Sequence, residues 1–176
     1  MRDISIPFNS GVVESLRAGD ECRLSGFLYS ARDQAHARLA KLIENGMPLP
    51  VNLENQVIYY MGPTPTPPRA VIGSCGPTTA SRMDPFTPLL LREGVRGLIG
   101  KGPRNSAVAE ALKLEQAVYF YAFGGCGALY SRKVTNVSPV AFPELGPEAV
   151  YGLTVSNLPV IVAMDSIGGS IFRLHS

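Results

Sequence analysis

The chain has 176 residues, about the size of one ordinary domain, and it carries a formal net charge of +2. Its hydrophobic content of 45% excludes intrinsic disorder, and the balance of 16 Lys and Arg against 14 Asp and Glu disfavours a basic nucleic-acid-binding protein. Charged residues make up only 17%, below the roughly 25% usual for soluble domains, so the excess of apolar surface predicts a partner subunit.

In chain order, the pattern predicts strands that alternate with helices. Residues 21–28 alternate as a half-buried strand, and residues 32–45 form an amphipathic helix that ends at Gly46, with Asp33 as a candidate cap. The further strands are 57–60, 70–72, 95–99, 117–123, 137–142 and 160–164, and the further helices are 87–93, 106–114 and 128–133. This order predicts an α/β fold in one domain, residues 1–176, with much of the sheet parallel.

Two stretches bear on the surroundings of the protein. The longest uncharged runs, 116–131 and 149–164, are shorter than the ~20 apolar residues of a membrane-spanning helix. The first seven residues lack the apolar run of a signal peptide, so we expect a soluble, cytoplasmic protein.

The cysteines Cys22, Cys75 and Cys126 have no close pair among them, and we expect small buried hydrophobic side chains rather than metal ligands.

Three polar clusters follow predicted strands, where α/β proteins place their sites. The first holds Arg32, Asp33 and His36; its plainer interpretation is a helix cap with a surface arginine. The second, residues 73–84, combines two glycines, several small hydroxyl residues and Arg82, and its plainer interpretation is a Gly-Pro turn. The third places Lys101 between two glycines, without the spacing of a P-loop.

Together these clusters predict a cationic pocket for a small anion. Arg32, Arg82 and Lys101 supply the charge, and Thr78 and Thr79 supply a pair of hydroxyls, which suits a dicarboxylate held by two guanidiniums. No acid–base pair or set of metal ligands accompanies them, so the chain carries half of an active site.

The motifs that carry these residues occur in a recognisable order. They are Ala31-Arg32-Asp33, Gly76-Pro77-Thr78-Thr79, Arg82-Met83-Asp84, Ile99-Gly100-Lys101-Gly102 and Glu144-Leu145-Gly146-Pro147-Glu148-Ala149. In this order, across about residues 20–170, the chain resembles the β subunit, or C-terminal domain, of class I fumarate hydratases and L-tartrate dehydratases, the iron–sulfur hydro-lyases.

The resemblance implies a swivelling β/β/α domain with a mixed sheet and flanking helices. It implies an α subunit that holds a 4Fe-4S cluster, with no metal bound by this chain and with activity only in the complex. The position of Thr78 is that of the base, for which Lys101 is a rival, and Arg32, Arg82 and Lys101 hold the substrate carboxylates. Asp33, His36 and Thr79 are expected beside them.

The expected reaction is the reversible hydration of fumarate to (S)-malate, a step of the tricarboxylic acid cycle. The alternatives are an L-tartrate dehydratase β subunit and a stand-alone dicarboxylate-binding module without catalysis. We expect the excess apolar surface to surround the pocket of Arg32, Thr78 and Lys101, where the α subunit would dock. For the isolated chain, a homodimer is a further option.

Overall fold

The computed structural model describes residues 1–9 and 11–172, and one sheet organises them. Its strands are β1 (Arg2–Ile6), β2 (Glu21–Ser30), β3 (Val57–Tyr59), β4 (Gly97–Gly100), β5 (Val118–Tyr121), β6 (Val134–Ala141) and β7 (Val150–Met164). The α-helices are α1 (Val12–Ser15), α2 (Asp33–Glu44), α3 (Thr87–Arg92), α4 (Ser106–Leu114) and α5 (Gly127–Ser131), and two 3-10 segments are η1 (Ala80–Met83) and η2 (Pro143–Glu148).

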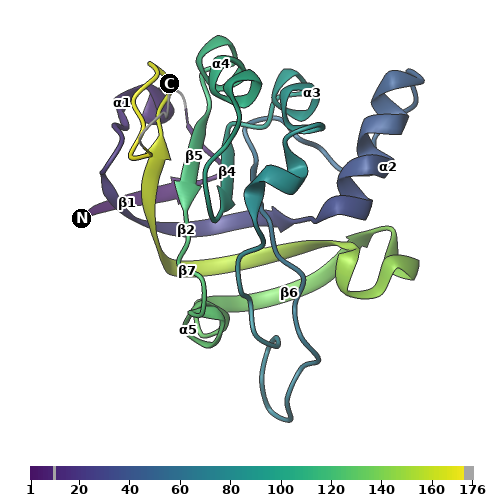
Figure 1. Ribbon diagram of the computed structural model, residues 1–176. Helices are drawn as coiled ribbons and strands as arrows, with labels where there is room; N and C mark the ends of the chain where they lie inside the picture. Colours follow the sequence, from purple (N-terminus) through teal and green to yellow (C-terminus); the bar gives the residue numbers. More distant parts are fainter. Residues whose placement is uncertain (10, 173–176) are drawn as a thin grey trace.

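The seven strands follow the order β1-β2-β3-β4-β5-β7-β6. Strands β1 to β5 pair in parallel, whereas the long β7 pairs antiparallel with β2, β5 and β6. Because β7 joins β5 to β2, the sheet closes on itself, and α2, α3 and α4 stand along one side of it (Figure 1). The predicted mixed sheet with flanking helices is confirmed, while its closure is a feature that local patterns do not reveal.

Apolar side chains fill two separate layers. Alternate residues of β3, such as Val57 and Tyr59, join a core inside the closed sheet, whereas Ile58 joins a second core that also contains Leu39 of α2 and Leu112 of α4. Strands buried on both faces read as continuous apolar runs, which accounts for most of the chain's high apolar content.

The helix from 106 to 114 is confirmed, and Asn105 caps it: the side chain of Asn105 accepts a hydrogen bond from Val108 N at 2.9 Å. The helix predicted from 32 to 45 is also confirmed, but Arg32 occupies the N-cap position, so Asp33 is not the cap. None of the helices in residues 1–9 and 11–172 is long and apolar enough to cross a membrane.

The strand predicted at residues 70–72 is wrong. These residues belong to the long loop between β3 and η1, which projects away from the sheet at the bottom of Figure 1. Prolines at 63, 65, 67 and 68 remove backbone donors from the opposite arm of this loop, so residues 70–72 find no ladder partner there. Conversely, β1 was not anticipated; it pairs in parallel with β2 along one edge.

Candidate functional site

The carboxyl ends of the parallel strands β2, β3 and β4 bring the predicted site residues to one edge of the sheet. The ladder continues one residue beyond the strands, because Ala31 N donates to Tyr59 O at 3.1 Å and Tyr60 N donates to Ile99 O at 2.8 Å. Arg32 therefore follows β2 where Lys101 follows β4, two strands away in the same layer. Open α/β sheets and parallel barrels alike bind their ligands at this edge.

Thr78 and Lys101 are joined through their backbones. Thr78 N donates to Tyr60 O at 2.7 Å, and Lys101 N donates to Thr78 O at 3.3 Å. Thr79 then bridges Lys101 in parallel, and Ala80 N donates to Lys101 O at 2.8 Å. The second cluster thus runs as a short extended segment before η1, so Thr78 does not share a helix with Arg82. Thr78 is half-buried and Thr79 is exposed.

The side chain of Lys101 lies against Gly124, after the end of β5. A Cβ atom at Gly124 would lie 3.5 Å from Lys101 Cδ and 3.7 Å from Nζ, so the glycine leaves room for the lysine. Within the described residues, Lys101 has no carboxylate within ion-pair distance. Its charge is therefore available to an anion.

Asp33 brings the two predicted arginines together. Arg82 Nε lies 2.9 Å from Asp33 Oδ1, and Arg32 Nε lies 3.9 Å from Asp33 Oδ2. The Arg82 side chain is 51% exposed and the Arg32 side chain 26%. One carboxylate therefore pairs with two guanidiniums, closely with the exposed Arg82 and more loosely with the partly exposed Arg32.

His36 lies beneath this pair rather than in contact with solvent. Its Nδ1 donates a hydrogen bond to Arg32 O at 2.8 Å, because a carbonyl can only accept, and its ring packs against Tyr60 at 5.3 Å between centroids. Burial lowers the pKa of His36 to about 4. The neutral imidazole therefore anchors the backbone of Arg32.

Two charged groups near the site were not predicted. Glu148, the last residue of η2, places Oε1 3.6 Å from Arg32 Nη2. Arg104 donates from Nε to the buried Asp84 at 2.6 Å and from Nη2 to Thr87 Oγ1 at 2.6 Å. Glu148 and Asp84 both belong to the motifs quoted above, and this was the only sign in the sequence that they lie near the site. Nothing in the sequence indicates which arginine each carboxylate contacts.

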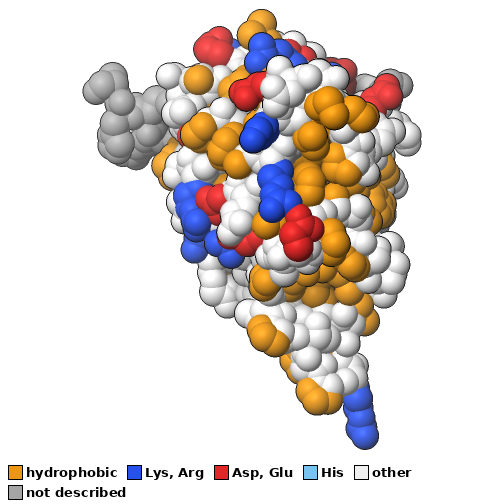
Figure 2. Space-filling model, turned by 90° about the vertical axis from the view of Figure 1, so that its right-hand side faces the viewer, with side chains coloured by type: hydrophobic (Ala, Val, Ile, Leu, Met, Phe, Trp, Pro, Cys, Tyr) orange, Lys and Arg blue, Asp and Glu red, His pale blue; other side chains and the backbone are white. Residues whose placement is uncertain are grey.

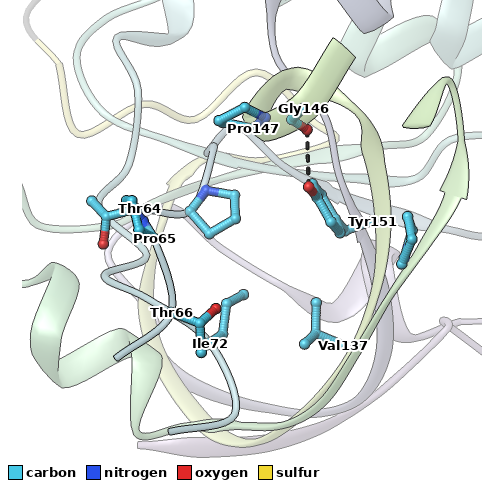
Figure 3. Close-up of a pocket in the computed structure, with 10 residues that line it drawn as sticks. Thr64, Pro65, Thr66, Ile72, Val137, Gly146, Pro147 and Tyr151 are labelled. Atoms are coloured by element: carbon cyan, nitrogen blue, oxygen red, sulfur yellow. Dashed lines mark hydrogen bonds between the residues drawn. The ribbon is translucent and has the colours of Figure 1, made fainter. Parts of the chain in front are cut away.

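The face that carries α2 and η2 shows basic and acidic side chains together near its centre, with apolar side chains beside them (Figure 2). A groove of about 310 Å³ lies next to Glu148, between the projecting loop, β6 and η2 (Figure 3). Its lining is uncharged: Pro63, Thr64, Pro65, Thr66, Ile72, Val137, Pro139, Gly146, Pro147 and Tyr151. A small anion therefore fits the arginines and Lys101 better than this groove.

Metal-ligating side chains do not gather anywhere in the described residues: no three of His, Cys, Asp and Glu are placed to share an ion. Cys22 and Cys75 are fully buried, and burial raises the pKa of Cys22 to about 11 and that of Cys75 to about 12. An iron–sulfur cluster needs thiolates, so these cysteines do not fit one. Cys22 and Cys75 confirm the prediction of small buried side chains, whereas Cys126, predicted to be buried as well, is partly exposed.

A family model described as "Fumarase C-terminus" matches residues 3–175. The chain belongs to this family. The fumarase C-terminus match therefore spans the sheet from the second residue of β1 onward and every residue of the candidate site.

Curated relatives of this fumarase C-terminus chain divide into two kinds. It is 37% identical to Fumarate hydratase 2 of Leishmania major, over 88% of this chain and 28% of that protein. It is 36% identical to the anaerobic class I fumarate hydratase of Escherichia coli, over 85% of this chain and 28% of that protein. It is 37% identical to a protein of Methanocaldococcus jannaschii that carries the provisional name L(+)-tartrate dehydratase subunit beta, over 92% of this chain and 86% of that protein. The chain thus spans 28% of the length of the two fumarate hydratases.

Proposed function

We propose that the chain is the β subunit of a two-subunit hydro-lyase that reversibly hydrates fumarate to (S)-malate and is active only with its α subunit. The observation that carries this proposal is the pair of guanidiniums, Arg32 and Arg82, held on Asp33 at the edge of the sheet that also carries Thr78 and Lys101. We place the enzyme in the cytoplasm and its reaction in the tricarboxylic acid cycle.

In this proposal, each substrate carboxylate pairs with one guanidinium, and Lys101 adds a third positive charge. Arginine suits this role because its planar fork of donors matches the two oxygens of a carboxylate. Holding both ends of a four-carbon acid fixes the carbons between them, which lowers the entropic cost of reaching the transition state.

Thr78 is the proposed base at the carbon that loses its proton. In the dehydration direction, Thr78 would take the proton, the C–H electrons form the new double bond, and the hydroxyl of the neighbouring carbon leaves with the electrons of its C–O bond; a proton from solvent turns it into water. A threonine hydroxyl is a weak base, and nearby positive charge favours its anionic form. Lys101, whose backbone is hydrogen-bonded to Thr78, is the rival base.

The α subunit is the proposed holder of the 4Fe-4S cluster, because the cysteines of this chain do not fit it. When bound, such a cluster supplies a Lewis-acid iron for the substrate hydroxyl. The residues of this chain would bind, orient and deprotonate the same substrate from the opposite side.

The proposal is tested by producing the chain together with its α subunit under anaerobic conditions and following fumarate absorbance. Hydration of fumarate supports it. Turnover of L-tartrate without hydration of fumarate would assign the chain to tartrate dehydratase instead, the second candidate, which the 86% length match to the M. jannaschii protein favours. Dicarboxylate binding without any turnover or stable complex would identify a stand-alone binding module.

A further inference from the structure

Glu148 contacts Arg32 in a setting that leaves buried polar atoms without hydrogen bonds. The Glu148 side chain is only 18% exposed, and its Oε1 lies 3.6 Å from Arg32 Nη2. Glu148 Oε2, Arg32 Nε and Asp33 Oδ2 are all shielded from solvent and have no hydrogen-bond partner. Shielding charged atoms in this way costs free energy, which only the attraction between these opposite charges offsets.

The backbone holds Glu148 at this place. Tyr151 donates from its hydroxyl to Gly146 O at 2.9 Å, as Figure 3 shows, and Ala149 N donates to the same oxygen at 3.0 Å. Gly146 has φ 57° and ψ −123°, a conformation that is readily available only to glycine. The turn that presents Glu148 is therefore fixed by a glycine and two hydrogen bonds, independently of Arg32.

Arg32 meets a carboxylate at two of its three nitrogens, in both cases at ion-pair distance. Asp33 faces Nε and Glu148 faces Nη2. Its side chain also passes close to Gly62, where a Cβ atom would lie 3.0 Å from Arg32 Cδ. Within the described residues the two ion pairs of Arg32 are made at Nε and Nη2, and none is made at Nη1. Because a guanidinium is planar, two carboxylates on adjacent sides set the direction in which the third nitrogen points.

We propose that Glu148 is a positioning residue that orients Arg32 for a substrate carboxylate. The identity of that ligand rests on the proposed function, whereas the orientation of Arg32 does not. A nearby anion also weakens the attraction between Arg32 and a substrate carboxylate, so Glu148 has two opposite effects. Orientation outweighs this weakening, because a guanidinium free to rotate would seldom meet its ligand in the bidentate geometry.

The test compares Glu148→Gln with Glu144→Gln, a matched control from the same 3-10 segment. Glu144 pairs with Arg38 on the surface and is 59% exposed. The first readout is the Nε–Hε resonance of Arg32 in the full chain, assigned by its loss in Arg32→Lys. We expect faster exchange of this proton with water in Glu148→Gln and no change in Glu144→Gln.

The second readout is kcat/KM of the assembled enzyme with fumarate. We expect Glu148→Gln to lower it by about 10- to 100-fold, the scale of a misplaced binding group, with Glu148→Asp intermediate and Glu144→Gln within about twofold of the wild type. Thermal unfolding of each variant shows that the fold is kept.

An Arg32 resonance that exchanges equally slowly in Glu148→Gln and the wild type would overturn the inference. Tighter binding of succinate by Glu148→Gln, with the Arg32 resonance unchanged, would also overturn it. Glu148 would then only compete with the ligand for the charge of Arg32. If the wild type neither hydrates fumarate nor binds succinate, the proposed function fails, and the resonance still decides whether Glu148 positions Arg32.

Discussion

Arg104 Nε lies 2.6 Å from Asp84 Oδ1, and both side chains are almost fully buried. The other oxygen of Asp84 accepts a hydrogen bond from Asn105 N at 3.0 Å, and the guanidinium lies 5.3 Å from the ring centre of Tyr60 and 5.0 Å from that of Tyr119. This pair ties the residue after η1 to the segment that follows Lys101. The pair therefore fixes the segment that carries Arg82 relative to the segment that carries Lys101.

Removing the charge of Asp84 should destabilise the whole fold. In Asp84→Asn the buried guanidinium of Arg104 loses its counter-ion, and we expect a decrease of about 3–5 kcal/mol in the free energy of unfolding, measured with urea. Glu110→Gln serves as the control, because Glu110 is 65% exposed in its pair with Lys113, and such pairs contribute about 0–1 kcal/mol. Equal losses in the two variants would contradict a structural role for the buried pair.

Arg82→Ala should impair the assembled enzyme without unfolding it. Truncating one partner of a hydrogen-bonded charge pair costs about 2–5 kcal/mol in binding, and we expect the lower end because the side chain is 51% exposed in the isolated chain. This corresponds to about a 30-fold loss of kcat/KM with fumarate. Arg92→Ala, an exposed arginine at the end of α3, is the control. Activity of Arg82→Ala within twofold of the control would remove Arg82 from the clamp.

Arg32 and Lys101 could be predicted from the sequence because each belongs to a polar motif that follows an apolar strand, whereas the motif of Thr78 and Arg82 follows the long loop and not the strand predicted at residues 70–72. The parallel order of β2, β3 and β4 then places these motifs at one edge. Glu148 could not be found this way. It reaches Arg32 only because β7 turns back to pair with β2 and closes the sheet, which no local pattern encodes.

The burial of Arg104 could not be predicted from the sequence either, since an arginine after a Gly-Pro pair resembles an exposed turn.

Composition was a weaker guide to a docking surface than the motifs were to the site, because the two cores take up most of the apolar side chains. Phe123 is exposed next to Gly124, which contacts Lys101, but Leu114 is exposed at the end of α4 and Ile167 is exposed after β7. An apolar docking surface around the site therefore stays a prediction.

His36 should make stability depend on pH. Burial lowers the pKa of its imidazole from about 6.5 to about 4; the hydrogen bond to Arg32 O and the charge of Asp33 raise it by less, and the charge of Arg104 lowers it further. The unfolded chain therefore binds a proton in this window that the folded chain does not, and stability should fall as the pH drops from 6.5 towards 4. The loss is on the order of 3 kcal/mol.

The measurement is urea unfolding at several pH values for the wild type and His36→Asn, whose amide can still donate to Arg32 O. Other carboxyl groups titrate in the same range in both proteins, so the informative quantity is the difference between them. That difference should shrink as the pH falls from 6.5 to 4. A difference that is constant with pH would show that His36 is not held neutral in the fold.

The cysteines should differ sharply in their reaction with iodoacetamide. Only the thiolate reacts, and burial raises the pKa of Cys22 to about 11 and that of Cys75 to about 12, with neither side chain accessible. Cys126 is partly exposed before α5. At pH 8 we expect the intact mass of the folded chain to gain a single adduct, at Cys126, and the chain in urea to gain three. Rapid labelling of Cys75 in the folded chain would mean that the core inside the closed sheet opens readily, since Cys75 lies within it.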